Sequence, residues 1–357
     1  MKIPAVPNEI IRVLIVDDSA LVRKILADGL SRDPEIQVVG QAGDPYRARD
    51  LLVELRPDVI TLDVEMPRMD GVTFLKRFMP VLPTPTVVVS SLTQHGKNLT
   101  LDALAAGAVD VVAKPVVGLV DGLPLMIDDI IRRVKAAAKA NVGPTSRMSA
   151  RPQTRSIHPG GAMDETTDRV IAIGASTGGV EALTRILPAF PADAPGIVVV
   201  QHMPIGFTAA FAERLDTLCK MRVKEAAKGD RVLRGQILIA PGGKQHLSVI
   251  RSGGEYRIVL EEGPEVNFSR PSVDVMFESV ARGVGRNAAA ALLTGMGKDG
   301  AAGLLAIRKS GGRTIAQNEA TCVIYGMPQA AVQVGGADAT APLNEIPALL
   351  VNALKQN

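Results

Sequence analysis

Short segments rich in Val and Ile alternate with segments of helical spacing along most of the chain. In its first part, strand-like runs are separated by helix-like runs, and the strand-like runs cover residues 12–16, 37–40, 58–62, 86–89 and 109–112. A closing helix-like run over 128–140 carries apolar residues on one face. Strands that alternate with helices favour a doubly wound parallel sheet, which binds ligands at the carboxyl ends of its strands.

Length and composition indicate a soluble protein of more than one domain. A chain of 357 residues exceeds one compact core, and 46% apolar with 22% charged residues is ordinary for a globular protein. A net charge of +3 and 3% aromatic residues argue against a nucleic-acid partner. The two cysteines form no CxxC pair, no signal peptide is legible, and no apolar run reaches the ~18 residues of a membrane span. We expect a cytoplasmic protein without membrane insertion.

Polar side chains follow the strand-like runs of the first part. Asp17 and Asp18 follow the first run, Asp63 the third, Ser90 lies at the end of the fourth, and Lys114 follows the fifth. Three carboxylates at one sheet edge repel each other unless a cation lies between them, and Mg²⁺ prefers such oxygen ligands. Taken singly, each acid is more simply a helix cap. Together the residues fit phosphoryl transfer to Asp63, with Mg²⁺ held by Asp17, Asp18 and Asp63.

Residues 11–138 resemble a response-regulator receiver domain, which has a flavodoxin-like fold with five parallel strands. The resemblance rests on these strand ends, on Asp63-x-x-Met-Pro-x-Met-Asp-Gly71 and on Lys114-Pro115. It implies that Asp63 is the phosphoacceptor and that Lys114 and Ser90 are the phosphate-contacting lysine and the switch hydroxyl. Many receivers carry an aromatic switch residue on the fifth strand, where this chain has Val111. An aromatic switch is therefore not expected.

Residues 139–168 are expected to form a flexible basic linker. The segment is rich in Gly, Pro, Ser, Thr and Arg and shows no apolar periodicity. A second domain is expected over residues 169–355. Its strand-like and helix-like runs predict a Rossmann-like α/β fold with a mainly parallel sheet and antiparallel additions, including a hairpin around Gly253.

The second domain begins with the run Val170–Gly179, in which a β-branched strand enters a glycine turn. The pattern Gly174-x-Ser176-x-Gly178 matches a nucleophile elbow, where small neighbours leave the serine hydroxyl exposed. A phosphate-binding turn of a nucleotide-binding fold remains the alternative.

Two further polar residues follow other strands and suit a hydrolytic triad with Ser176. His202 follows the strand-like run 196–200, and Asp299 lies one loop beyond the run 288–293. A serine needs a base within hydrogen-bond reach, and the base needs an orienting acid. His246 competes as the base, and Asp299 is alternatively the N-cap of the helix that follows it.

Residues 169–352 are similar to the catalytic domain of CheB-type chemotaxis protein-glutamate methylesterases. The matching motifs are Gly174–Gly179, Val200–Pro204, Arg270–Asp274, Leu293–Gly300 and Tyr325–Pro328. The resemblance implies that Ser176 is the nucleophile, His202 the general base and acid, and Asp299 the residue that orients it. It also implies an oxyanion hole around Met296 and Thr177.

The resemblance carries further expectations about partners. Methylated chemoreceptors would be the substrate, with methyl glutamate hydrolysed and certain glutamines deamidated, and a chemotaxis histidine kinase would donate phosphate. We expect Mg²⁺ at the receiver, no cofactor at the esterase site, a monomer, and recruitment to chemoreceptor arrays. A receiver that controls DNA binding or nucleotide binding, without esterase activity, is the alternative.

Overall fold

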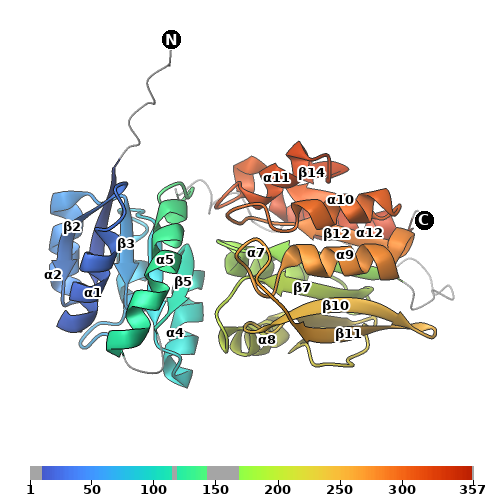
Figure 1. The fold of residues 1–357 in the computed structure, drawn as a ribbon, viewed down its shortest axis with the longest axis horizontal. Coiled ribbons are helices and arrows are strands. Elements are labelled where there is room, and N and C mark those ends of the chain that lie inside the picture. Colours follow the sequence, from blue (N-terminus) through green and yellow to red (C-terminus); the bar gives the residue numbers. More distant parts are fainter. Residues whose placement is uncertain (1–9, 115–118, 143–168, 356–357) are drawn as a thin grey trace, which may run out of the picture. The chain divides into compact units, whose positions relative to one another are not determined.

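The structure is a computed structural model that describes residues 10–114, 119–142 and 169–355, with the side chains of the second range described from residue 126. The chain divides into two compact units, residues 1–144 and 145–357, which are described separately below (Figure 1). Residues 143–168 of the expected linker lie outside the described part. Within the described residues, no helix is long and apolar enough to cross a membrane.

The first unit alternates strands and helices as its sequence predicts (Figure 1). Its strands are β1 (Ile11–Val16), β2 (Ile36–Ala42), β3 (Val59–Leu62), β4 (Thr86–Ser90) and β5 (Asp110–Ala113). Its helices are α1 (Ala20–Leu30), α2 (Pro45–Leu55), α3 (Gly71–Phe78), α4 (Gln94–Ala105) and α5 (Leu119–Ala137). The strands form one parallel sheet in the order β2-β1-β3-β4-β5. This is the five-stranded parallel sheet that the sequence predicted.

Two helices of the first unit begin earlier than their apolar patterns suggested. Helix α4 was expected from residue 99 but begins at Gln94, because the Thr93 hydroxyl accepts a hydrogen bond from the Gly96 N–H at 2.9 Å and caps the helix. Helix α5 was expected from residue 128 but begins at Leu119.

The second unit contains two sheets (Figure 1). Its strands are β6 (Val170–Ala175), β7 (Gly196–Gln201), β8 (Arg222–Glu225), β9 (Gln236–Ile239), β10 (Gln245–Ser252), β11 (Glu255–Glu262), β12 (Ala288–Leu292), β13 (Arg313–Gln317) and β14 (Ala339–Ala341). Its α-helices are α7 (Gly179–Ile186), α8 (Phe207–Leu218), α9 (Val273–Gly283), α10 (Ala301–Lys309), α11 (Met327–Gln333) and α12 (Ile346–Lys355). Short 3₁₀ turns cover Leu187–Ala189, Gly285–Asn287, Glu319–Thr321 and Leu343–Glu345.

The large sheet of the second unit is parallel throughout, in the order β14-β13-β12-β6-β7-β9-β8. Strands β10 and β11 form a separate antiparallel hairpin. The α/β class, the parallel sheet and the antiparallel addition are therefore as predicted. Strand order reverses at β6, because β7 lies on one side of it and β12 on the other. In such sheets, ligands bind next to the carboxyl ends of the strands where the order reverses, which here are the ends of β6, β7 and β12.

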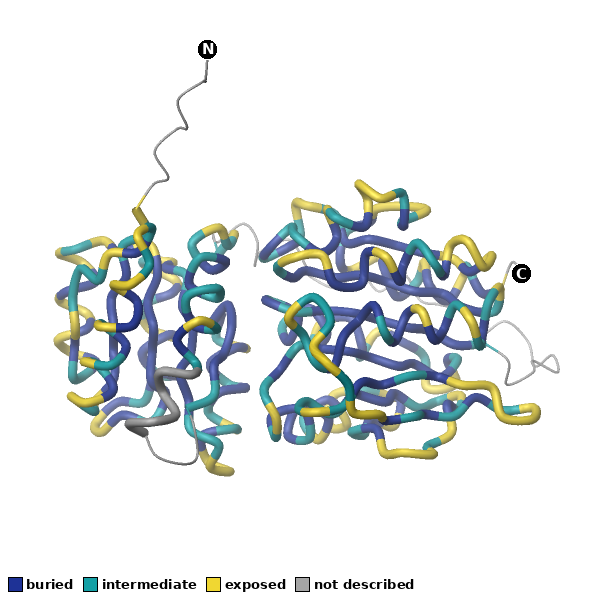
Figure 2. Tube along the Cα trace, viewed as in Figure 1, coloured by how far each residue is buried: buried dark blue, intermediate teal, exposed yellow. Residues whose placement is uncertain are grey.

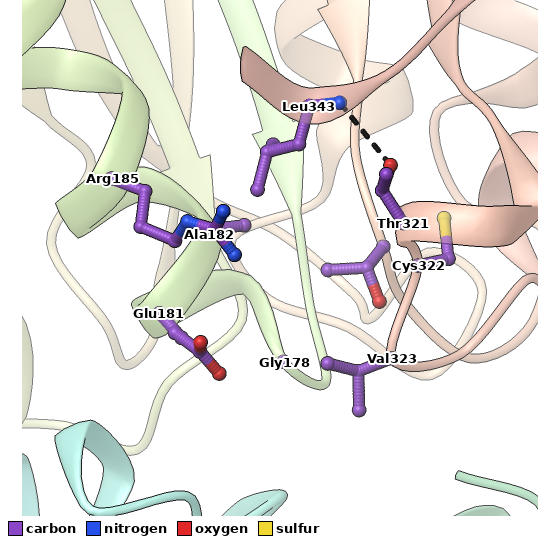
Figure 3. Close-up of a pocket in the computed structure, with 9 residues that line it drawn as sticks. Gly178, Glu181, Ala182, Arg185, Thr321, Cys322, Val323 and Leu343 are labelled. Carbon is purple, nitrogen blue, oxygen red and sulfur yellow. Dashed lines mark hydrogen bonds between the residues drawn. The ribbon is translucent and has the colours of Figure 1, made fainter. Parts of the chain in front are cut away.

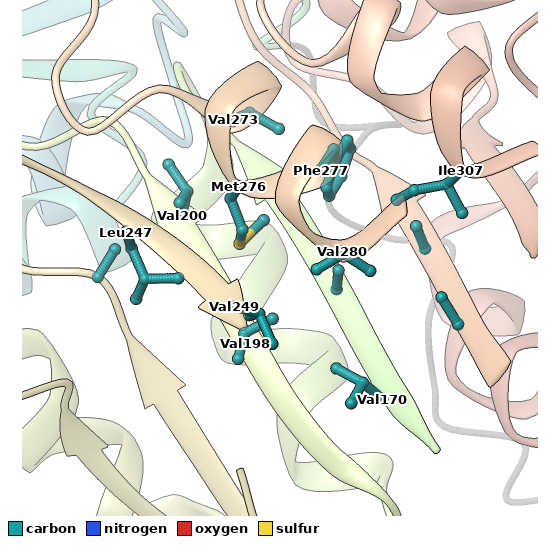
Figure 4. Packing of buried hydrophobic residues seen from close by; sticks show 14 of the residues in the cluster. Val170, Val198, Val200, Leu247, Val249, Val273, Met276, Phe277, Val280 and Ile307 are labelled. Atoms are coloured by element: carbon teal, nitrogen blue, oxygen red, sulfur yellow. The ribbon is translucent and has the colours of Figure 1, made fainter. Parts of the chain in front are cut away.

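The core of the second unit is closed by helix α9, which packs on one face of the sheet and on the hairpin (Figure 4). Met276, Phe277 and Val280 of α9 are fully buried against strand residues such as Val198 and against Val249 of the hairpin. The central strands are buried along their whole length, as Figure 2 shows. Strands buried on both faces read as continuous apolar runs, which is why β6, β7 and β12 are legible in the sequence.

Candidate functional site

Ser176 follows the last residue of β6 and lies on a tight turn into α7. The turn is closed by a hydrogen bond from the Gly179 N–H to the Ser176 carbonyl oxygen at 2.7 Å. Gly178 has φ +77°, and a Cβ atom there would overlap Val323. Glycine is therefore required at this position on both conformational and steric grounds. The turn leaves Ser176 partly exposed at the carboxyl edge of the sheet.

The neighbouring strand β7 is hydrogen-bonded to this turn through Gln201, its last residue, and through His202, which follows it. The backbone N–H of His202 donates to the carbonyl oxygen of Ala175 at 3.1 Å, and the side-chain amide of Gln201 donates to the carbonyl oxygen of Ser176 at 2.9 Å. On the other side, the Ser176 N–H donates to the carbonyl oxygen of Thr294 at 3.0 Å. Ser176 is thus held between the ends of β7 and β12.

His202 and Asp299 are in direct contact. Nε2 of His202 lies 2.9 Å from Oδ2 of Asp299. A carboxylate only accepts, so the proton of the neutral ring is on Nε2 and Nδ1 is an acceptor. The hydroxyl of Ser269 lies 3.2 Å from Nδ1 and donates to it. Among the described residues, no hydrogen bond joins the Oγ of Ser176 to the ring. The structure therefore forms the predicted His–Asp contact and places Ser176 at the same sheet edge.

Asp299 is almost fully buried and strongly hydrogen-bonded. Its oxygens accept from the Ser272 hydroxyl at 2.7 Å, from the Val273 N–H at 2.7 Å and from the Asp274 N–H at 3.2 Å. Burial alone would raise the pKa of Asp299, but the hydrogen bond of His202, the charge of its ring when protonated, and these donors hold the pKa below its usual value. Asp299 therefore stays ionised and can orient the imidazole.

The alternative of Asp299 as the N-cap of the helix that follows it is wrong. That helix, α10, is preceded by Gly300, which has φ +87° and makes no side-chain cap. Asp299 instead accepts from the first backbone N–H groups of α9, which precedes it in the chain. The partial positive charge of this helix start favours the carboxylate.

His246 is committed to other partners. Its Nε2 lies 2.8 Å from the Pro264 carbonyl oxygen, and its Nδ1 accepts from the Ser272 N–H at 3.1 Å. Both ring nitrogens are therefore engaged by backbone groups in a buried position. His246 supports the segment that leads into α9, and His202 is the histidine that contacts the buried acid.

The backbone near Met296 lies against the nucleophile turn. A Cβ atom added to Gly295 would come within 2.7 Å of the Ser176 Cβ, so only glycine allows this approach. Met296 follows it and is half-buried. Thr177 is buried, and its carbonyl oxygen accepts from the Thr294 hydroxyl at 3.0 Å. The two backbone segments expected to form an oxyanion hole therefore both lie next to Ser176.

Asn267, Ser269 and Ser272 were not predicted as parts of this site. The amide of Asn267 donates to Asp274 at 2.8 Å and to Asp299 at 3.2 Å. The only signal in the sequence was the motif Arg270–Asp274, which contains Ser272 and follows Asn267 and Ser269, and for which the sequence predicted no role. Its function here is to begin α9 with N–H groups that face Asp299.

A small pocket lies beside the nucleophile turn, on the side of α7 (Figure 3). Gly178, Arg185 and Val323 are among its lining residues. Neither Ser176 nor His202 lines it. The pocket therefore shares Gly178 and Thr294 with the contacts of the Ser176 turn but is not lined by the candidate nucleophile or base.

In the first unit, the predicted acids converge. Carboxylate oxygens of Asp17, Asp18 and Asp63 lie within 4.8 Å of one another. The Nζ of Lys114 lies 2.6 Å from Asp63 and 2.8 Å from Asp17. Three carboxylates with one exposed member, Asp18, suit a cation that keeps several waters, as Mg²⁺ does. The donor set therefore fits Mg²⁺.

Burial raises the pKa of Asp63 to about 6, and the charge of Asp17 adds to this effect while Lys114 opposes it. Burial would lower the pKa of Lys114, but the two carboxylates outweigh it and raise that pKa. The hydroxyl of Ser90 donates to the Gly96 carbonyl oxygen at 3.3 Å and so joins the end of β4 to α4.

Comparisons with known proteins agree with both halves of this description. Residues 171–350 match the family model for the CheB methylesterase, and residues 13–119 match the model for the response regulator receiver domain. A protein-glutamate methylesterase/protein-glutamine glutaminase of Syntrophotalea carbinolica is 55% identical over 97% of this chain and 98% of its own length. The chain belongs to the CheB family.

Other CheB relatives point the same way. A protein of Pseudomonas aeruginosa described as protein-glutamate methylesterase/protein-glutamine glutaminase 2 is 52% identical over 96% of each chain. The crystal structure of the Thermotoga maritima CheB methylesterase catalytic domain is 39% identical, with a TM-score of 0.50. It covers 52% of this chain and 97% of that one. The family therefore accounts for a receiver domain followed by a methylesterase domain.

Proposed function

We propose that this chain hydrolyses γ-methyl esters of glutamate residues in chemoreceptors and deamidates specific receptor glutamines, with Ser176, His202 and Asp299 as the catalytic residues. The contact between His202 and the buried, ionised Asp299, at the sheet edge that also carries Ser176, is the observation that carries the proposal. Family membership supports the same reaction.

In the proposed mechanism, Ser176 replaces Ser269 at the single lone pair of Nδ1 on His202. The Oγ of Ser176 then attacks the γ-carbonyl carbon while His202 takes its proton on Nδ1. Backbone N–H groups near Met296 and Thr177 stabilise the oxyanion, an effect typically worth ~10²–10³ in rate for one donor. The imidazolium returns the proton to the leaving methoxide, and methanol departs. Water then attacks the acyl-serine with His202 as base, which frees glutamate and Ser176. With a glutamine substrate, ammonia leaves in place of methanol.

The receiver supplies control through Asp63. A chemotaxis histidine kinase is the proposed phosphodonor, Asp17, Asp18 and Asp63 are the proposed Mg²⁺ ligands, and Lys114 contacts the phosphoryl group with Ser90 as the switch hydroxyl. Bound Mg²⁺ would neutralise charge on the phosphoryl oxygens. We place the protein in the cytoplasm as a monomer recruited to chemoreceptor arrays, with residues 11–138 as the receiver, 139–168 as the linker and 169–355 as the catalytic domain.

The test is methanol release from purified methylated chemoreceptor by the wild type and by Ser176→Ala. The variant should lose at least ~10⁴-fold in rate, because the acyl-enzyme is no longer formed. A serine-directed ester probe that labels Ser176 would separate an esterase from a DNA-binding or nucleotide-binding regulator. Retained methanol release in Ser176→Ala would refute the assignment.

A further inference from the structure

A two-residue turn at the active site holds an aromatic residue in an unfavourable conformation. Val266 and Ser269 exchange backbone hydrogen bonds of 3.1 and 3.0 Å, and the two residues between them, Asn267 and Phe268, have φ values of +51° and +60°. Asparagine tolerates this left-handed region, whereas a bulky residue there is an outlier. Turns of this kind favour glycine as the second central residue. Strain of this sort clusters at functional sites.

The side chains on both sides of Phe268 are attached to the catalytic pair. Asn267 donates to Asp299 at 3.2 Å, and Ser269 donates to Nδ1 of His202 at 3.2 Å. These contacts hold the turn beside the imidazole. Phe268 lies between them at the tip of the turn, with 79% of its surface exposed.

A second exposed apolar residue lies on the loop that follows His202. Ile205 is 59% exposed. Its side chain lies close to Gly243, because a Cβ atom added to that glycine would be 3.2 Å from the Cδ1 of Ile205. The carbonyl oxygen of Gly243, on the loop before β10, accepts from Nε of Arg270 at 3.0 Å. This neighbouring loop therefore links the loop of Ile205 to the segment that carries Phe268. Apolar surface is therefore presented by two connected loops beside the active site.

We propose that Phe268 is a substrate-contacting residue whose ring packs against apolar side chains of the receptor segment that carries the methylated glutamate. The turn that holds Phe268 is hydrogen-bonded to His202 and Asp299, so a receptor segment whose ester reaches these residues would pass beside it. The methyl ester is uncharged, and Phe268 and Ile205 expose apolar surface beside the site, so apolar side chains next to the glutamate would suit this surface better than charged ones. The inference rests on the proposed function, because it names what the same site recognises.

The test uses the full chain and compares Phe268→Gly, Phe268→Leu and the control Leu218→Ala, whose exposed side chain lies at the end of α8. Methanol release is measured against the concentration of methylated receptor, and hydrolysis of p-nitrophenyl acetate reports the catalytic residues alone. We expect Phe268→Gly to raise KM for the receptor about tenfold or more with little change in kcat. Phe268→Leu should lie between it and the wild type, and Leu218→Ala should match the wild type.

Hydrolysis of the small ester should be unchanged in all variants, and the Tm of Phe268→Gly should not fall, because glycine adopts positive φ without strain. An unchanged KM for the receptor in Phe268→Gly would overturn the inference, as would an equal loss on both substrates. If the wild type releases methanol normally, either of these two results would refute the role of Phe268 and leave the proposed function intact. A wild type that releases no methanol would overturn both.

Discussion

Asp299 accepts a hydrogen bond at 2.7 Å from the backbone N–H of Val273, the first residue of helix α9, although 26 positions separate the two residues in the chain. The same carboxylate oxygen lies 2.9 Å from Nε2 of His202. One buried charge therefore stabilises the start of a helix and orients the imidazole of His202. Under the proposed mechanism, catalysis and local stability are coupled through this group.

Asp299→Asn tests this coupling. The amide keeps an acceptor but loses the charge, so the preference for the Nε2–H tautomer of His202 is lost. We expect kcat for methanol release to fall by about 10⁴-fold, and the free energy of unfolding of the catalytic unit to fall by about 1–3 kcal/mol. Steady-state kinetics and urea unfolding followed by circular dichroism measure the two effects. A large loss of activity with unchanged stability would argue against the shared role.

Ser269→Ala tests the hydrogen bond to Nδ1 of His202. The hydroxyl donates to Nδ1 before Ser176 takes its place there, and it can accept from the Nδ1–H of the imidazolium. It therefore positions the ring before and after the transfer of the Ser176 proton. We expect kcat to fall about tenfold, which corresponds to one hydrogen bond of about 1.4 kcal/mol, with KM little changed. Ser269→Thr keeps the hydroxyl and should recover most of the activity. Equal losses in the alanine and threonine variants would show that the hydrogen bond has no such role.

Asp63→Asn tests control by the receiver. A small acyl phosphate with Mg²⁺ should accelerate methanol release by the wild type, and the variant should not respond because it lacks the acceptor carboxylate. Removal of Mg²⁺ with a chelator should abolish the response of the wild type. A chain without residues 1–144 serves as the control and should be insensitive to both additions. Acceleration of Asp63→Asn by the acyl phosphate would place the phosphorylation site elsewhere.

The raised pKa of Asp274 predicts that the free energy of unfolding depends on pH in an unusual direction. Burial, together with the charge of Asp299, raises the pKa of Asp274 to about 6, although the Gly303 N–H opposes the shift. Between pH ~4 and ~6 the folded state therefore binds more protons than the unfolded state, and stability falls as pH rises, by up to about 3 kcal/mol from this group. Asp299 has the opposite shift, and its contribution is lost as pH falls through its lowered pKa.

Asp274→Asn separates the contribution of Asp274 to the pH dependence of stability from that of the other groups. The variant should lose less stability than the wild type between pH 4 and 7, because it lacks the titrating carboxyl. Urea unfolding at a series of pH values gives both curves. Parallel curves would mean that Asp274 titrates normally in the folded protein.

The sequence was sufficient to predict the fold because the decisive patterns are local. Buried parallel strands read as apolar runs, and the polar residues that follow them mark the functional edge of each sheet. Ser176, His202 and the three receiver acids were found in this way. The adjacency of β12, β6 and β7, which brings these ends together, depends on strand order and is seen only in the structure.

The remaining residues of the candidate site could not be found in this way. Asn267 and Ser269 are ordinary polar loop residues, and their contacts exist only because the segment before α9 folds back across the sheet edge. Asp299 was recognised as a candidate, but the helix that it stabilises precedes it in the chain. No local pattern links a carboxylate to a helix start so far away.

Helix α9 comes close to the sheet because Gly174 has no side chain. A Cβ atom there would overlap Val273, so a larger residue would push the first turn of α9 outward. The N–H groups of that turn would then withdraw from Asp299, and the pKa of the carboxyl would rise towards the value that burial alone favours. The ionisation of Asp299 is thus set in part by the size of a buried residue that carries no charge, so a substitution in the core would change the proposed chemistry without touching a polar group.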